Sequence, residues 1–312
     1  MQPKTGEPGM GKRQTAERES MPVLSVHLAT RSWADLGVAL LGLGLPIAGA
    51  STVSCEILPW READAPTVVE LAERLDWICH ERGVRVLMLD GPQAWKADDN
   101  GFAHSRTAER VLHTAAKMGR PGTVLPGTYE RFVGYCLALY DALARLGWQR
   151  LMAGQAGSPA RSRAESSAGQ RFLVESYPHA AWKSLGIRPL PARRRCRVSD
   201  LARAWADLSA VVPIYASQPP NHNQMQAIVG GLPGLALAAD LSGERAGESA
   251  AAQTDSERGG DFRRAGRPAD PPPMVGSRIV GQPPRQVDGH WREGFIAVPV
   301  APAASSIRWN RE

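Results

Sequence analysis

Residues 66–92, with the sequence PTVVELAERLDWICHERGVRVLMLDGP, decide the fold class of this chain. Pro66 stands where helices favour proline, at the first helical position. Apolar residues then recur every three or four positions, which predicts a helix with one buried face that ends at Gly83. The apolar run 84–89 follows and stops at Asp90, so it predicts a short buried strand. A helix that leads into such a strand indicates a parallel crossover.

The residues before this unit predict more strands. Residues 23–28 and 36–41 are apolar runs separated by a polar turn, which predicts an antiparallel hairpin. A third strand is expected over residues 51–58. A hairpin followed by alternating helices and strands predicts an α/β fold with a mixed sheet flanked by helices.

The residues after this unit continue the alternation. Apolar runs predict strands over residues 171–176 and 291–299. Pro233 stands inside the last helical pattern and is expected to kink that helix. Helical spacing of apolar residues covers residues 105–118, 128–146, 178–185, 199–211 and 222–239.

The composition divides the chain into one folded domain and segments of low complexity. Residues 1–20 are polar with mixed charge and are expected to form a disordered arm. Residues 21–240 carry the strand and helix patterns of the domain. Residues 241–286 combine glycine, proline and charge with few large apolar side chains, which predicts a disordered insert. Residues 287–312 are expected to supply a returning strand and a tail.

Composition and charge exclude several classes of protein. The 312 residues are 43% hydrophobic and 22% charged, which excludes a wholly disordered chain, a collagen and a coiled coil. The 4 cysteines are far apart and form no CxxC pair, so we expect reduced thiols in a cytoplasmic protein. No apolar run is long enough to span a bilayer, and no membrane partner is expected. The net charge of +6 permits a polyanionic partner such as nucleic acid.

Candidate functional residues stand at the predicted strand ends. Sites in open α/β sheets lie beyond the carboxyl ends of the strands. Asp90 ends one predicted strand, and Glu175 and His27 lie near the ends of two others. His222 and Asn223 begin the last predicted helix. Carboxylates from separate segments are ligands for Mg²⁺, and paired ions assist phosphodiester hydrolysis. The alternative for Asp90 is a turn residue that accepts hydrogen bonds from nearby backbone N–H groups.

Two further features admit a functional and a structural interpretation. Trp95 could stack on a base, or it could pack against the next helix. A run of arginines could bind phosphates, or it could be a solvated loop. This run comprises Arg188, Arg193, Arg194, Arg195 and Arg197. The chain has no GxxxxGK[ST] or GxSxG motif, which disfavours a P-loop enzyme and a serine hydrolase.

The order of four segments resembles the domain of unknown function 429 family. The segments are Leu89 to Trp95 (LDGPQAW), Phe172 to Trp182 (FLVESYPHAAW), Asn221 to Leu237 and Trp291 to Ile296 (WREGFI). The resemblance covers residues 22–240 and 288–299. The family is regarded as a set of predicted nucleases, so the resemblance implies a ribonuclease-H-like mixed sheet flanked by helices.

The family pattern implies four acidic positions, of which this chain keeps Asp90 and Glu175. The chain has His27 and Asn223 where the other acids are expected. The resemblance therefore implies metal ligation by Asp90, Glu175 and Asn223, with Mg²⁺ or the softer Mn²⁺ as cofactor. It also implies catalytic roles for Asp90 and Glu175, with His27 or His222 as the proton carrier. We expect the carboxylates of Asp90 and Glu175 within about 6 Å of each other.

The implied function is a divalent-metal-dependent nuclease or phosphodiesterase, a hydrolase whose metal site has lost two acids. Whether the chain is an enzyme stays open at this point. The alternative is a non-catalytic protein of the same fold that binds nucleic acid or a nucleotide. A phosphotransferase is disfavoured, because 312 residues leave little room for a second nucleotide-binding half.

Overall fold

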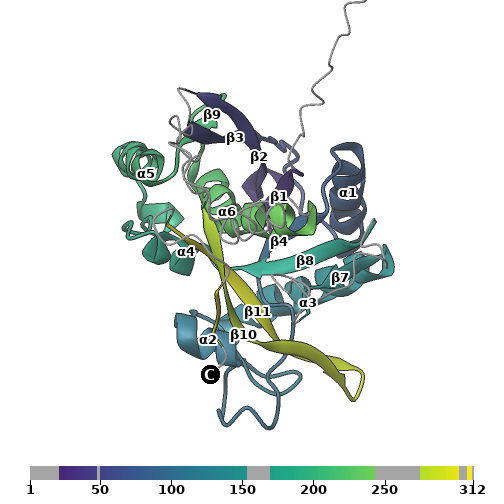
Figure 1. Cartoon of the computed structure of the whole chain (residues 1–312). Coiled ribbons are helices and arrows are strands. Elements are labelled where there is room, and N and C mark those ends of the chain that lie inside the picture. Colours follow the sequence, from purple (N-terminus) through teal and green to yellow (C-terminus); the bar gives the residue numbers. More distant parts are fainter. Residues whose placement is uncertain (1–20, 48–49, 153–168, 243–274, 302–307, 311–312) are drawn as a thin grey trace, which may run out of the picture.

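The computed structural model describes residues 21–47, 50–152, 169–242, 275–301 and 308–310. Its centre is a mixed sheet in the order β12-β10-β11-β8-β4-β1-β2-β3-β9, with β7 paired to β8 (Figure 1). The strands are β1 (Val23–His27), β2 (Gly37–Ile47), β3 (Ala50–Ile57), β4 (Val86–Asp90), β7 (Trp148–Arg150), β8 (Arg171–Ser176), β9 (Ile214–Ala216), β10 (Gly276–Val287), β11 (His290–Val300) and β12 (Arg308–Asn310). A separate small sheet joins β5 (Lys117–Met118) to β6 (Val124–Leu125).

The helices connect the strands and cover the sheet. They are α1 (Val68–Glu81), α2 (Thr107–Leu112), α3 (Glu130–Arg145), α4 (Pro178–Ser184), α5 (Val198–Val211) and α6 (His222–Ser242). Short 3₁₀ turns occur at η1 (Trp33–Asp35), η2 (Gly127–Tyr129) and η3 (Arg193–Arg195). No helix in the described ranges is both long and apolar enough to cross a membrane.

The predicted hairpin and parallel crossover are confirmed. β1 pairs with β2 in antiparallel orientation, and β4 lies parallel to β1 on its other side. β8 extends the sheet as a further parallel strand beside β4. The crossover helix α1 begins with a capping box, in which Thr67 and Glu70 satisfy each other's backbone N–H groups. It ends before Gly83, whose φ of +63° suits glycine.

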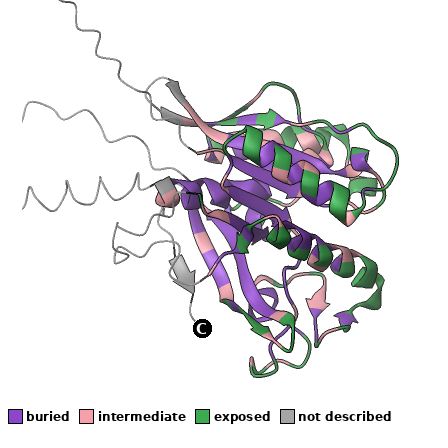
Figure 2. Cartoon of the chain, turned by 90° about the vertical axis from the view of Figure 1, so that its right-hand side faces the viewer, coloured by how far each residue is buried: buried purple, intermediate pink, exposed green. Residues whose placement is uncertain are grey.

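Helices cover both faces of the sheet, so its central strands are buried (Figure 2). Helix α6 packs on β1, β2 and β4 and forms the larger apolar core with α4 and α5. Helices α1 and α3 form a second core on the opposite face. Helix α6 approaches closely at Gly231, where a Cβ would lie 2.6 Å from the Cβ of Ser25. It continues through Pro233 as one helix.

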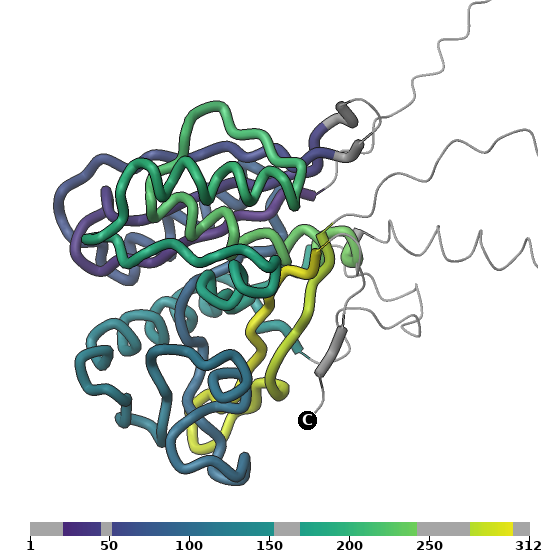
Figure 3. The backbone as a smooth tube through the Cα atoms, turned by 90° about the vertical axis from the view of Figure 1, so that its left-hand side faces the viewer, coloured from purple at the N-terminus to yellow at the C-terminus, as the bar shows by residue number. Residues whose placement is uncertain are grey.

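Two segments differ from the sequence expectations. Helix α2 covers Thr107–Leu112 and not residues 105–118, because His113 takes the left-handed conformation (φ 54°) that ends it. Residues 276–286, expected within a disordered insert, form most of β10, because β11 supplies a long antiparallel partner. Figure 3 shows the β10–β11 pair in yellow, running from the middle of the molecule through its lower half. The predicted arm 1–20 and residues 243–274 of the insert lie outside the described residues.

Candidate functional site

His27 and Asp90 meet at the carboxyl ends of two neighbouring parallel strands. The register of β1 and β4 places the two residues side by side. Nδ1 of His27 lies 2.5 Å from Oδ2 of Asp90, so the ring donates to the carboxylate. Their side chains are 25% and 18% exposed, so both reach solvent. Within the described ranges, this is the hydrogen bond that His27 makes, and Nε2 is left open to a ligand.

Glu175 lies on the opposite face of the sheet from Asp90. In the register of β4 and β8, Leu89 stands beside Glu175 and Asp90 stands beside Ser176. Successive side chains of a strand point to opposite faces, so the two carboxylates project away from each other. The structure therefore does not bring Asp90 and Glu175 together, and the expectation that they share one metal ion is corrected.

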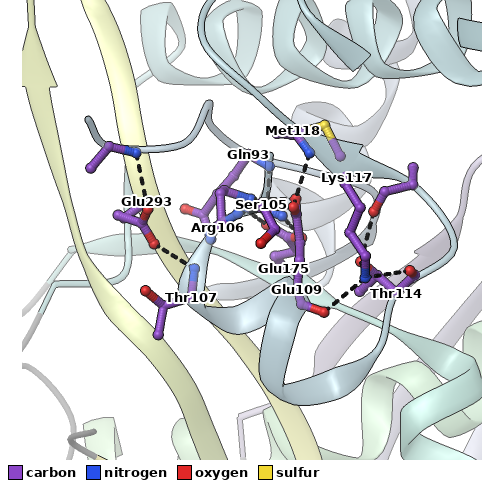
Figure 4. Close-up of polar contacts among 12 residues, drawn as sticks. Gln93, Ser105, Arg106, Thr107, Glu109, Thr114, Lys117, Met118, Glu175 and Glu293 are labelled. Carbon is purple, nitrogen blue, oxygen red and sulfur yellow. Dashed lines mark hydrogen bonds and ion pairs between the residues drawn. The ribbon is translucent and has the colours of Figure 1, made fainter. Parts of the chain in front are cut away.

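Glu175 belongs to a buried charged cluster that it forms with Arg106 and Glu109 (Figure 4). Nη1 and Nη2 of Arg106 donate to the two oxygens of Glu175 at 2.8 and 2.6 Å, and Nε donates to Glu109 at 2.7 Å. The backbone N–H of Gln93 donates to Glu175 at 3.0 Å. Because a guanidinium already pairs both oxygens of Glu175, a metal ion would have to compete with Arg106 for this carboxylate.

Burial and charge act against each other within the charged cluster. Burial opposes the positive charge of Arg106, but the carboxylates of Glu175 and Glu109 hold its pKa well above the ordinary value. Burial raises the pKa of Glu175, although Arg106 counteracts part of that effect. Burial, with smaller contributions from Asp90 and Glu175, raises the pKa of the nearby Cys136 far enough that it stays a thiol.

Sequence reasoning missed three charged residues that organise this region. Arg106 and Glu109 are separated by three positions, a spacing that allows a contact within one helical turn. Glu293 belongs to the WREGFI segment, and its fully buried carboxylate accepts hydrogen bonds from the backbone of Ala97 and Thr107 and from Asn100. These bonds fix the loop between β4 and α2 against β11. The signals available in the sequence were the three-residue spacing of Arg106 and Glu109 and the acid within the segment WREGFI.

His222 and Asn223 lie at the edge that holds His27, but their polar atoms are engaged by the chain itself. Nε2 of His222 lies 2.9 Å from the carbonyl oxygen of Pro191, and Nδ1 lies 3.2 Å from Oδ1 of Asn223. Nδ2 of Asn223 donates to the carbonyl oxygen of Asp35 at 2.6 Å. The structure therefore uses both residues to connect the start of α6 to its surroundings, and it does not place His222 as a partner of Asp90.

A single close contact fixes the start of α6 beside His27. Gly37 pairs with His27 across the hairpin. A Cβ at Gly37 would lie 2.0 Å from the carbonyl oxygen of Asn223, so only glycine permits this approach. The His27–Asp90 pair and the start of α6 thus share one edge of the sheet.

The arginine segment, residues 188–197, lies at the same edge. Nη1 of Arg193 lies 2.5 Å from Oδ1 of Asp35, the residue whose carbonyl binds Asn223. Each of Arg188, Arg193, Arg194, Arg195 and Arg197 is exposed.

Trp95 is half-buried and packs against an apolar cluster of the protein, which favours the structural interpretation over stacking on a base. Its N–H donates to the carbonyl oxygen of Trp291 at 2.9 Å, and its side chain packs with Met118, Val124 and Val133. Trp95 therefore packs within the protein, but its partners belong to β5, β6 and α3 and not, as predicted, to the next helix, α2.

The residues present do not fit the two-ion site that the family resemblance implies. The described residues contain no group of three or more His, Cys, Asp and Glu side chains that could hold a metal ion. Of the three predicted ligands, Glu175 is paired with Arg106 and Asn223 with Asp35. Asp90 remains, with an imidazole beside it, and one carboxylate cannot neutralise two divalent cations.

Comparisons with known proteins give distant structural neighbours only. No protein-family model matches the chain, and no curated protein matches it. A structure of Thermus thermophilus RuvC matches with 10% identity and a TM-score of 0.33, over 73% of this chain and 97% of that chain. T. thermophilus RuvC in complex with a Holliday junction substrate matches with 11% identity and a TM-score of 0.31, over 73% and 96%. Likeness at this level does not assign the chain to a family, so membership of the domain of unknown function 429 family stays a prediction.

Proposed function

We propose that this protein is a phosphodiester hydrolase of the ribonuclease-H-like fold that acts on nucleic acid, with the His27–Asp90 pair as its reactive centre. The observation that carries the proposal is the 2.5 Å contact between His27 and Asp90 at the carboxyl edge of the sheet, with both side chains partly exposed. The proposed fold is supported by the mixed sheet. In this sheet, β1 lies between its antiparallel partner β2 and the parallel strand β4.

The pair provides a proton acceptor in a fixed orientation. Because Oδ2 of Asp90 accepts the Nδ1–H of His27, the lone pair of the imidazole lies on Nε2. Nε2 takes a proton from an attacking water while the water oxygen forms a bond to phosphorus. The bond from phosphorus to the leaving oxygen breaks, that oxygen takes a proton from solvent, and the imidazolium releases its own proton to solvent. The carboxylate of Asp90 stabilises the imidazolium between the two transfers.

Support for a metal-dependent version is weaker, because the predicted ligands are separated or already paired. A divalent ion would supply charge neutralisation at the scissile phosphate. This chain offers the exposed arginine segment for that purpose at the same edge of the sheet. No step of the proposed chemistry is assigned to a metal.

The test is cleavage of labelled single-stranded and duplex oligonucleotides in EDTA, Mg²⁺ and Mn²⁺. The wild type is compared with His27→Asn and Asp90→Asn. The matched control is His80→Asn, an exposed histidine on α1. We expect cleavage in EDTA, with a loss of about 10²–10⁴-fold in His27→Asn and wild-type rates in His80→Asn. An inactive wild type, or a fully active His27→Asn, would overturn the proposal.

A second candidate is a non-catalytic nucleic-acid-binding protein of the same fold. It is favoured by the pairing of Glu175 with Arg106, which removes the second expected carboxylate from the site. This function predicts oligonucleotide binding without cleavage, and equal affinity for the wild type and His27→Asn.

A further inference from the structure

We infer that the arginine segment, residues 188–197, is a docking surface for the phosphate backbone of a nucleic acid that extends to the His27–Asp90 pair. This inference deepens the proposed function, because it locates the surface that holds the substrate. It rests on the charge, the fixed backbone and the position of the segment.

The charge of this region is positive, and the first acid after it is Asp200, which interacts electrostatically with Arg197 and pairs with Arg203. Residues 176–199 contain Lys183 and the five arginines of the segment, but no Asp or Glu. Among the described residues, Arg193 pairs with Asp35, whereas the other four arginines of the segment form no ion pair. Exposed guanidinium groups without acidic partners remain available to an external anion.

The backbone of the segment is held in place while its charged ends face solvent. Ile187 and Leu190 are 6% and 8% exposed and belong to the larger apolar core. The carbonyl oxygen of Pro191 lies 2.9 Å from Nε2 of His222 on α6. A fixed backbone lowers the entropy cost of ordering the segment on binding.

The position of the segment directs a bound polymer toward the proposed reactive centre. Arg193 contacts Asp35, and Asp35 in turn contacts Asn223 at the start of α6. The start of α6 rests on Gly37, the hairpin partner of His27. A continuous set of contacts therefore joins the arginine segment to the His27–Asp90 pair along one edge of the sheet.

The chemistry of the segment favours nucleic acid over an anionic membrane surface. All five cations of the segment are arginines, whose planar donors match phosphate oxygens in pairs. The segment contains Pro189 and Pro191 and one 3₁₀ turn at η3. It therefore lacks the amphipathic helix with which interfacial proteins bury an apolar face in lipid.

The test measures the binding of fluorescein-labelled 20-nucleotide single strands and duplexes by anisotropy between 50 and 200 mM salt. All proteins compared carry His27→Asn, which suppresses the proposed cleavage of the probe. The variant is R194Q/R195Q/R197Q. The control is R110Q/R131Q/R145Q, which removes the same charge from exposed arginines of α2 and α3. We expect the first variant to lose about 10-fold or more in affinity and to lower the salt slope by about 2–3. The control should keep nearly all of its affinity, because its arginines belong to α2 and α3 and not to the segment.

Three results would overturn the inference. Equal losses in both triple variants would show attraction by net charge alone. Unchanged oligonucleotide binding by the segment variant would exclude the segment. Unchanged oligonucleotide binding, combined with lost binding to phosphatidylserine vesicles, would identify a lipid surface as the partner. Circular dichroism of both variants checks that the fold is intact.

The same variants separate this inference from the proposed function. His27→Asn should bind oligonucleotides as the wild type does, so an absence of cleavage leaves the docking surface standing. A segment variant that binds oligonucleotides as tightly as its His27→Asn parent overturns the docking surface alone, because the cleavage test of the His27–Asp90 pair uses proteins in which the arginine segment is unchanged.

Discussion

The carboxylate of Asp90 meets an imidazole and solvent, whereas the carboxylate of Glu175, on the adjacent strand, is buried against a guanidinium. One residue of register separates the two, because Asp90 pairs with Ser176 and not with Glu175. That offset places Asp90 on the face covered by α6 and Glu175 on the face covered by α3. The comparison teaches that parallel strands bring their last residues to one edge of the sheet. Which of these side chains can meet depends on the face of the sheet to which each one points.

The two environments carry different energetic consequences. A buried charge is costly to leave without a partner, so Glu175 and Arg106 depend strongly on each other. A partly exposed pair keeps much of its hydration, so the His27–Asp90 contact contributes less to stability. We therefore infer that Glu175 stabilises the fold and that Asp90 belongs to the candidate functional site.

The largest expected effect comes from removing the cation of the charged cluster. Arg106→Met leaves two buried carboxylates without their guanidinium partner. We expect the free energy of unfolding to fall by about 3–5 kcal/mol, measured by urea titration. Arg110→Met, at an exposed position of α2, the helix that Arg106 caps, is the control and should change the free energy of unfolding by less than about 0.5 kcal/mol. Equal stabilities of the two variants would show that the cluster does not hold the fold.

The second effect compares the two carboxylates directly. Glu175→Gln should lower the free energy of unfolding by about 3 kcal/mol, because Arg106 loses its bidentate partner in the interior. Asp90→Asn removes one charge of a partly exposed pair and should cost at most about 1 kcal/mol. Asp90→Asn should instead lose cleavage activity. Equal losses in the free energy of unfolding would contradict the view that Glu175 stabilises the fold while Asp90 serves the candidate site.

The sequence predicted the central strands because their apolar runs and turns are local signals. The same signals placed His27 and Asp90 at strand ends, and the register brings them together. The face of Glu175 was not readable, because residues 172–174 are apolar without alternation and are buried on both sides. In such a run, a one-residue offset leaves no trace in the hydrophobic pattern.

Other features depend on contacts between distant residues. Arg106 is separated from Glu175 by 69 positions, and no local pattern connects them. β10 contains Pro283 and Pro284 and was predicted as low complexity, but its pairing with β11 makes it a strand. Tertiary partners determine these elements, so a single sequence does not reveal them.

The third effect concerns the position where the family pattern expects an acid. Asn223→Asp replaces an amide donor with a carboxylate that faces the carbonyl oxygen of Asp35, 2.6 Å from the present nitrogen. We expect a loss of about 1–3 kcal/mol, because the part-buried carbonyl oxygen of Asp35 loses its donor. Added Mg²⁺ should not raise the melting temperature of the variant above that of the wild type. A gain with Mg²⁺ would show that the position still serves as a metal ligand.

The smallest effect distinguishes the two histidines that share the site's edge. His27 leaves Nε2 open, whereas both ring nitrogens of His222 face oxygens of the chain. His222→Ala removes the bond to Pro191 and should cost about 0.5–1.5 kcal/mol, measured by urea titration. Hydrolysis of a small phosphodiester should stay at the wild-type rate, because His222 has no part in the proton transfers. Oligonucleotide affinity should fall less than in the triple arginine variant, since the guanidinium groups remain.

The rescue control is His222→Gln, which offers a side-chain N–H donor to Pro191 and should recover part of the lost stability. If His222→Ala instead abolishes hydrolysis while the fold is intact, then His222 takes part in the chemistry and the division between the two histidines fails.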